Sequence, residues 1–194
     1  MTPFIAPRIP CFCLKLLVGL ISLNACTGFA DEAWQSRQLH DQFFSEGASF
    51  GDIDGDGRGD LVAGPYWWKG PDLAKRYEIY EPKPFGVRTY SDNFFSHVFD
   101  IDGDGHQDVL VFGFPGKEGR LYLNPGKPKK DGSWKMIVVA DQICHESPSF
   151  VDIVPGGLPE IVSSRERAFG YFQAGSDPTK PWSWHSVSEA GETV

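Results

Sequence analysis

The sequence has few cysteines, no long apolar run and no basic cluster. Four of its 194 residues are cysteine, and Cys11 and Cys13 lie within the first 30 residues, so the rest of the chain has no disulfide framework. The longest apolar run, Leu16 to Leu23, is too short to span a bilayer. The formal net charge is −8, and the absence of a basic patch argues against a nucleic-acid partner.

Glycine, proline and aromatic residues are abundant. The chain contains 22 glycines and 15 prolines, and 14% of its residues are aromatic. This composition favours many short strands joined by turns over helices. A length of 194 residues is enough for one domain with a buried core. We therefore expect an all-β fold.

Residues 1–30 have the pattern of a signal peptide. Arg8 and Lys15 precede the apolar run, and Gly28-Phe29-Ala30 suits cleavage before Asp31. Alternatively, Leu23-Asn24-Ala25-Cys26 is similar to a bacterial lipobox, which would make Cys26 a lipid anchor. We expect a secreted, extracytoplasmic protein, with a membrane-anchored lipoprotein as the alternative. Both locations supply millimolar calcium to weak sites.

Two acidic nonapeptides, 52–60 and 100–108, place carboxylates at positions 1, 3, 5 and 9. Carboxylates this close repel one another unless a hard cation lies between them, and calcium suits an oxygen-rich loop. Position 7 offers its backbone carbonyl, so its side chain varies. The expected ligands of two structural Ca²⁺ sites are Asp52, Asp54, Asp56, Arg58 (carbonyl) and Asp60, and Asp100, Asp102, Asp104, His106 (carbonyl) and Asp108.

These loops are not EF-hands. Position 12, where an EF-hand carries a bidentate Glu, is Ala63 in the first loop and Val111 in the second. The flanking segments alternate polar and apolar residues, which is typical of strands. Glycines at positions 4 and 6 of each loop permit the positive φ that the turn requires.

The acidic loops belong to an internal repeat. Asp52, Asp100 and Asp152 occupy equivalent positions, and about four strands are expected in each unit of roughly 48 residues, the size of a propeller blade. The blades are placed at about 41–90, 91–140 and 141–190, within a repeat domain of 31–194. The third loop carries Val154 and Gly156 where carboxylates should stand, so we expect an ordinary hairpin there.

The number of repeats is too small for a closed propeller. Residues Trp34 to Leu39 are typical of a closing strand without its blade. Three four-stranded blades plus this strand predict an incomplete ring, since propellers have at least four blades. Exposed blade faces and edges favour aggregation. We expect a truncated product or fragment, with assembly of several copies into one ring as the alternative.

The repeats resemble the FG-GAP/VCBS repeats of integrin-α-like β-propellers. The resemblance rests on Ser49-Phe50-Gly51-Asp52, on the two D-x-D-x-D-G-x-x-D loops and on Asp60-Leu61-Val62-Ala63-Gly64-Pro65, and it covers about residues 41–187. It implies a seven-bladed ring with calcium in the hairpin between the first two strands of a blade, at the ten ligand positions given above. Secreted bacterial proteins of this type use such repeats as binding or assembly modules.

Candidate catalytic motifs are better explained by structure. Gly47-Ala48-Ser49-Phe50-Gly51 matches G-x-S-x-G, but Ser49 runs into an acidic loop and not into the helix that this chemistry requires. Cys144 and His145 are neighbours on an expected strand and so face opposite sides. Arg58-Gly59-Asp60 matches an adhesion tripeptide, but Asp60 should face the cation.

The expected function is therefore a non-catalytic, calcium-binding extracellular module that binds or scaffolds a protein or glycan. Two alternatives stay open. One is the propeller part of a secreted carbohydrate-active lyase or hydrolase. The other is a glycan or protein adhesion module that uses the exposed faces of Tyr66, Trp67, Trp68, Trp182 and Trp184.

Overall fold

The computed structural model describes residues 36–127 and 134–188. The chain divides into two compact units, Met1–Arg37 and Gln38–Val194. Every element described below belongs to the second unit. The expected signal peptide, the lipobox at Cys26, and Trp34 and Gln35 of the expected closing strand lie outside the described residues.

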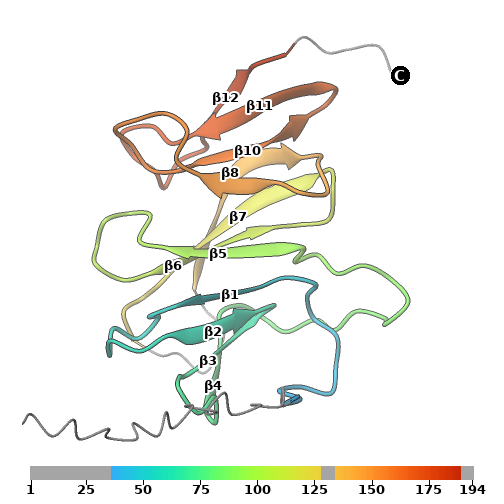
Figure 1. Ribbon diagram of the computed structural model, residues 1–194, viewed down its shortest axis with the longest axis vertical. Coiled ribbons are helices and arrows are strands. Elements are labelled where there is room, and N and C mark those ends of the chain that lie inside the picture. Colours follow the sequence, from blue (N-terminus) through green and yellow to red (C-terminus); the bar gives the residue numbers. More distant parts are fainter. Residues whose placement is uncertain (1–35, 128–133, 189–194) are drawn as a thin grey trace, which may run out of the picture. The chain divides into compact units, whose positions relative to one another are not determined.

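The described residues form twelve strands in three antiparallel sheets and contain no helix (Figure 1). Each sheet pairs its strands in chain order. The first sheet contains β1 (Ala48–Gly51), β2 (Asp60–Ala63), β3 (Tyr66–Trp68) and β4 (Arg76–Glu78); the second β5 (Phe95–Phe99), β6 (Asp108–Phe112), β7 (Lys117–Leu123) and β8 (Lys135–Ile143); the third β9 (Ser149–Val151), β10 (Glu160–Arg165), β11 (Ala168–Gln173) and β12 (Ser183–Ser186). The expected all-β, blade-type architecture is confirmed.

The sheets stack through two apolar layers. Between the first and second sheets the buried side chains include Val62, Trp67, Val109 and Val111. Between the second and third sheets they include Leu110, Phe112, Leu121, Ile161 and Phe172. Because neighbouring strand residues point to opposite faces, Val109 and Leu110 pack against different sheets. The second sheet is therefore covered on one face by the first sheet and on the other face by the third.

Equivalent isoleucines show where the stack ends. Ile53 and Ile101 are each 2% exposed, because the following sheet covers them, whereas Ile153 is 48% exposed. The tryptophans Trp67, Trp68 and Trp182 are also buried. The described residues form no closed ring, in agreement with the expected incomplete ring.

The residue that precedes the first acidic loop, Gly51, lies where the first and second sheets approach each other closely. A Cβ atom at Gly51 would lie 2.2 Å from Cγ1 of Val98 and 2.3 Å from Oε1 of Gln107. These atoms belong to the second sheet and its loop, so the two sheets approach closely only because this residue has no side chain.

The expected N-terminal closing strand is absent from the part of that segment that the structure describes. The described part of that segment, residues 36–39, forms no strand, and the chain first pairs at Phe43, which bridges to Phe85. A closing strand needs the edge of a further blade, and a single Phe43–Phe85 bridge cannot replace it.

His97 on β5 gives this fold a predicted sensitivity to acid. Its ring packs 5.0 Å from the Phe112 ring and 5.7 Å from the Phe150 ring, and its buried Nε2 atom has no hydrogen-bond partner. Burial lowers the pKa of His97 below its ordinary value of 6.5. The unfolded chain therefore takes up this proton at higher pH than the folded chain does, so His97 destabilises the fold as the pH falls below about 6.5.

We expect His97→Phe to remove this contribution while keeping an aromatic ring in place. The free energy of unfolding of the unsubstituted protein should fall, relative to the variant, by up to about 1.4 kcal/mol for each pH unit below 6.5. Urea unfolding between pH 7.5 and 5.5, at saturating calcium, measures the difference. Parallel pH profiles for the two proteins would show that the pKa of His97 is the same in the folded and unfolded chain.

Candidate metal centre

Both acidic loops join the first two strands of a sheet. The first connects β1 to β2 and the second connects β5 to β6, and the two loops lie at the same end of their sheets, on the left in Figure 1. Four loop glycines adopt positive φ: Gly55 at 72°, Gly57 at 81°, Gly103 at 76° and Gly105 at 89°. The predicted glycine conformations are thus confirmed, and they turn the chain back within a few residues.

The last aspartate of each loop is a buried anchor. Asp60 begins β2 and is 0% exposed; its Oδ2 accepts from the Ile53 N–H at 2.9 Å and its Oδ1 from the Gly70 N–H at 2.7 Å. Asp108 begins β6 and is 1% exposed, with the same pattern from Ile101 at 3.1 Å and Asn124 at 2.8 Å. Each carboxylate ties its loop to the next hairpin.

Burial affects the protonation of these anchors. It raises the pKa of Asp60, and it raises the pKa of Asp108 to about 6, although backbone hydrogen bonds from Asn124 and Ile101 act in the opposite direction. A divalent cation beside the carboxylate would favour the ionised form instead. A bound cation would therefore offset the cost of burying these two charges.

The first aspartate of each loop holds the turn. Asp52 accepts from the Asp56 N–H at 3.0 Å and the Gly57 N–H at 2.8 Å. Asp100 accepts from the Gly103 N–H at 2.9 Å and the Gly105 N–H at 3.0 Å. Both loops therefore curl around their first carboxylate, which accepts from positions 5 and 6 in the first loop and from positions 4 and 6 in the second.

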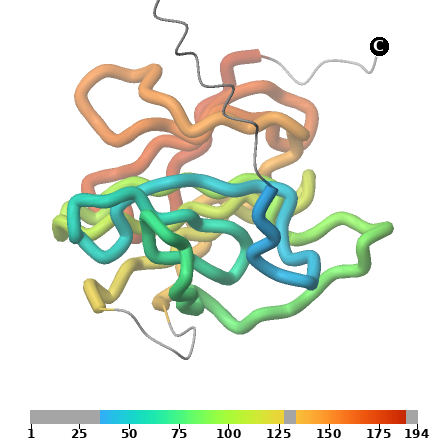
Figure 2. Tube along the Cα trace, turned by 60° about the horizontal axis from the view of Figure 1, so that its bottom comes forward, coloured from blue at the N-terminus to red at the C-terminus, as the bar shows by residue number. Residues whose placement is uncertain are grey.

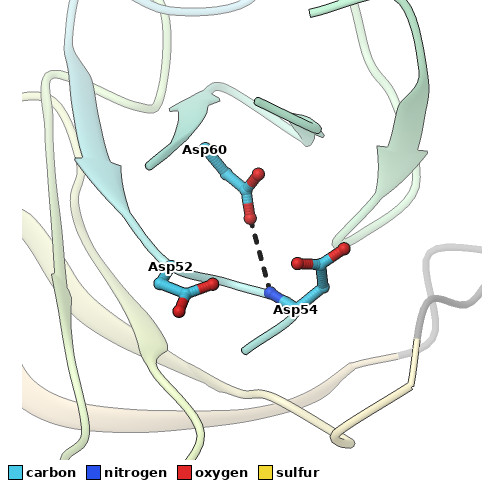
Figure 3. Close-up of side chains that lie close together, drawn as sticks. All are labelled: Asp52, Asp54 and Asp60. Carbon is cyan, nitrogen blue, oxygen red and sulfur yellow. Dashed lines mark hydrogen bonds between the residues drawn. The ribbon is translucent and has the colours of Figure 1, made fainter. Parts of the chain in front are cut away.

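Three carboxylates converge in each loop. Oxygen atoms of Asp52, Asp54 and Asp60 lie within 4.8 Å of one another, and so do those of Asp100, Asp102 and Asp108. Figure 3 shows the first triad, with the backbone N–H of Asp54 donating to Oδ2 of Asp60 at 3.4 Å. The Oδ1 atom of Asp54 is buried and has no hydrogen-bond partner. An all-oxygen donor set with an unsatisfied carboxylate oxygen fits a hard divalent cation.

The other predicted ligands lie outside these triads. Asp56 forms an ion pair with Lys69 at 2.7 Å, and its Oδ1 accepts from the Arg58 N–H at 3.0 Å. Asp104 is exposed, and its Oδ1 accepts from the His106 N–H at 2.8 Å. The structure thus brings together three of the four predicted carboxylates in each loop.

Lys69 distinguishes the first loop from the second. Its ammonium group contacts both Asp54 and Asp56, and their hydrogen bonds raise the pKa of Lys69, that with Asp54 most. Gly70 and Asn124 make the same backbone hydrogen bond to their loop anchors, so Lys69 corresponds to Leu123 in the second sheet. The first loop therefore has a cation of its own, and the second has a leucine at that place.

The two loops are also joined to each other. The Asp52 N–H donates to Oε1 of Gln107 at 2.6 Å. The amide nitrogen of Asn124 donates to the carbonyls of Ile53 at 2.8 Å and Gln107 at 2.9 Å. The sequence did not predict the roles of Lys69, Gln107 and Asn124. Each of them makes its contact with an acidic loop that lies far from it in the chain.

The third loop has a hydrogen-bonded hairpin in place of an acid triad. Oε2 of Glu160 accepts from the N–H groups of Ile153 at 3.0 Å and Val154 at 3.2 Å, and Oε1 accepts from Gln173 at 3.3 Å. Glu160 thus keeps the anchoring role of Asp60 and Asp108. Within residues 36–127 and 134–188, the two groups of acidic side chains close enough to hold a metal lie in the first two loops.

Two of the three alternative motifs lie within the first sheet, in β1 and at the start of β2. Ser49 lies within β1 with its Oγ buried, which gives it none of the geometry of a nucleophile that precedes a helix. Asp60 of Arg58-Gly59-Asp60 is buried and cannot face a receptor. Cys144 is a free, partly buried thiol.

No family model, curated protein or solved structure matches this chain. In the part of the chain that the structure describes, no helix has the length and apolarity needed to cross a membrane.

Proposed function

We propose that this protein is an exported, non-catalytic module of FG-GAP/VCBS-type propeller repeats that two calcium ions stabilise. The observation that carries the proposal is the repeated acid triad, Asp52/Asp54/Asp60 and Asp100/Asp102/Asp108, at the same place in two consecutive sheets. Two glycines with positive φ lie between the second and third aspartates of each triad, and the triad offers oxygen donors only.

The donor chemistry favours calcium over other divalent cations. Calcium accepts six to eight oxygen ligands in variable geometry, whereas magnesium requires a near-octahedral shell and zinc prefers histidine or cysteine. The triads contain neither histidine nor cysteine. Asp56 and Asp104, with the carbonyls of Arg58 and His106, would supply the remaining ligands that calcium needs. Export would place the loops in the millimolar calcium that such sites can use.

A bound calcium ion would act on the fold and not on a substrate. It would connect the end of β1 or β5 to the start of β2 or β6 through the buried anchor carboxylate. Because Gln107 and Asn124 link the two loops, order in one loop supports the other. The module would then present its sheets and connections as a rigid scaffold for a protein or glycan ligand.

Removal of calcium tests the proposal. Binding to the folded state alone stabilises it by about 2.7 kcal/mol per site at a hundredfold excess over Kd. For a chain of this size that corresponds to roughly 5 to 10 °C in Tm per site. Thermal unfolding in 5–10 mM Ca²⁺ and in excess chelator measures the difference, and isothermal titration should give two sites per chain. Equal melting temperatures, or no binding in the titration, would refute the proposal.

A further inference from the structure

Two side-chain amides join the acidic loops across the boundary between the first and second sheets. The Asp52 N–H donates to Oε1 of Gln107 at 2.6 Å, and the side-chain nitrogen of Asn124 donates to the Ile53 carbonyl at 2.8 Å. Figure 2 shows the two joined loops side by side from a second direction. Asp52 is the first member of its triad and Ile53 is the next residue, so both amides hold the backbone that carries predicted ligands of the first loop.

The same two amides are also fixed to the second loop. Gln107 lies within that loop, directly before the anchor Asp108, and its carbonyl accepts from the Asn124 side chain at 2.9 Å. The Asn124 backbone N–H donates to Oδ1 of Asp108 at 2.8 Å. Asn124 is buried, and its Oδ1 accepts from the Gly126 N–H at 3.0 Å, so its side chain is held at both polar atoms. A movement of either loop would therefore break hydrogen bonds of the other.

This bridge joins the two loops that carry acid triads, and the third loop has no counterpart of it. The strand registers place Pro159 and Ala174 of the third sheet at the positions that Gln107 and Asn124 occupy in the second. Neither Pro159 nor Ala174 has a side chain that can donate or accept a hydrogen bond. The bridging amides are therefore lost in the same repeat that has lost its acid triad.

The bridge links a closed state of one loop to the closed state of the other. In the closed state the carboxylates of a triad converge and the bridging hydrogen bonds are formed. In an open state, which repulsion between the carboxylates favours, the Asp52 N–H and the Ile53 carbonyl would turn to water. A cation that closes one loop keeps its side of the bridge in place, and this lowers the free-energy cost of closing the other loop.

The charges of the loops allow both cations to bind together, and Lys69 indicates which binds first. Each loop carries four aspartates, which outnumber the two charges of one calcium ion, so a filled loop stays acidic. The Lys69 ammonium contacts Asp54 and Asp56 in the first loop. The second sheet has Leu123 at that place, so its loop binds a cation without displacing a lysine. The second loop should therefore fill first.

We propose that Gln107 and Asn124 are positioning residues that make calcium binding by the two loops cooperative, an inference that rests on the calcium function proposed above. An ion in the second loop fixes Gln107 and, through Asp108, Asn124. These two side chains then hold Asp52 and Ile53 in the closed first loop. The coupling raises the calcium affinity of the first loop, which Lys69 lowers, towards that of the second.

Calcium titrations of the full chain, followed by NMR, test the proposal. The amide signals of Gly57 and Gly105 report the two loops separately, because each N–H donates to the first aspartate of its own loop. Asp102→Ala disables the second site and should weaken calcium binding by the first loop about 5-fold. In a Gln107→Ala or an Asn124→Ala background, Asp102→Ala should weaken it by less than about 2-fold. The lost charge of Asp102 acts equally in every background, so this comparison cancels it.

Gln173→Ala is the matched control, because the Gln173 amide donates to Glu160 at 3.3 Å and takes no part in the bridge. The effect of Asp102→Ala should persist in that background, and thermal unfolding should show that each variant is folded. Equal affinity of the first loop with and without Asp102→Ala would overturn the coupling and leave calcium binding intact. An undiminished effect in both bridge variants would overturn the role of Gln107 and Asn124. If calcium shifted neither glycine signal in the unsubstituted chain, the calcium function and the coupling would both fail.

Discussion

Replacing Asp108 with alanine should lower the free energy of unfolding in calcium by about 6 kcal/mol. The substitution removes the acceptor for the N–H groups of Ile101 and Asn124, and hydrogen bonds to a charged group contribute about 1.5–3 kcal/mol each. It also removes a ligand of the second site, which loses the stabilisation that bound calcium supplies. Urea unfolding in calcium and in chelator separates the two contributions.

Glu160→Ala is the matched control for Asp108→Ala. Glu160 holds the N–H groups of Ile153 and Val154 in the same way, but its loop has no acid triad among the described residues. Its substitution should be destabilising by the same amount with and without calcium. If the destabilisation by Asp108→Ala were the same with and without calcium, Asp108 would be an anchor only and the second loop would not bind the ion.

Replacing Lys69 with leucine should raise the calcium affinity of the first loop about 10-fold, or about 1.4 kcal/mol. In the calcium-free protein the Lys69 ammonium already neutralises Asp54 and Asp56, so a calcium ion must displace it. Leucine is the residue at the equivalent place in the second sheet. Isothermal titration in an Asp102→Ala background, where the second loop is disabled, measures the first loop alone.

Lys75→Leu controls for the change in net charge. Lys75 is exposed, and within the described residues it forms no ion pair. Its substitution should change the calcium affinity of the first loop by much less than tenfold. An unchanged or lower affinity in Lys69→Leu would mean that the lysine does not compete with the cation, for example because it turns to solvent when calcium binds.

The strands and the acidic loops could be predicted because their signals are local. Leu61 and Val62 follow Asp60 as Val109 and Leu110 follow Asp108, and the alternation of faces in β2 and β6 follows from this pattern. Gly55 and Gly103 have the positive φ that their places in the loop imply. The loss of two acids in the third loop likewise predicted its hairpin.

The contacts between loops and sheets could not be predicted in this way. Strands β2 and β3 separate Lys69 from Asp54 in the chain, and Gln107 contacts Asp52 from the next repeat. The expected strand over Trp34 to Leu39 was wrong for its described part, because pairing depends on the edge that a strand meets and not on its own pattern.

The sequence by itself determined the repeat, the strand periodicity and the carboxylate spacing, since these depend on residues within one hairpin. The tertiary structure alone decided two further features: which carboxylates converge, and that a lysine enters only the first loop. Each depends on atoms brought together by stacking of separate sheets. The physical reason is that side-chain contacts across sheets arise from packing, whereas loop conformation arises from local backbone preferences.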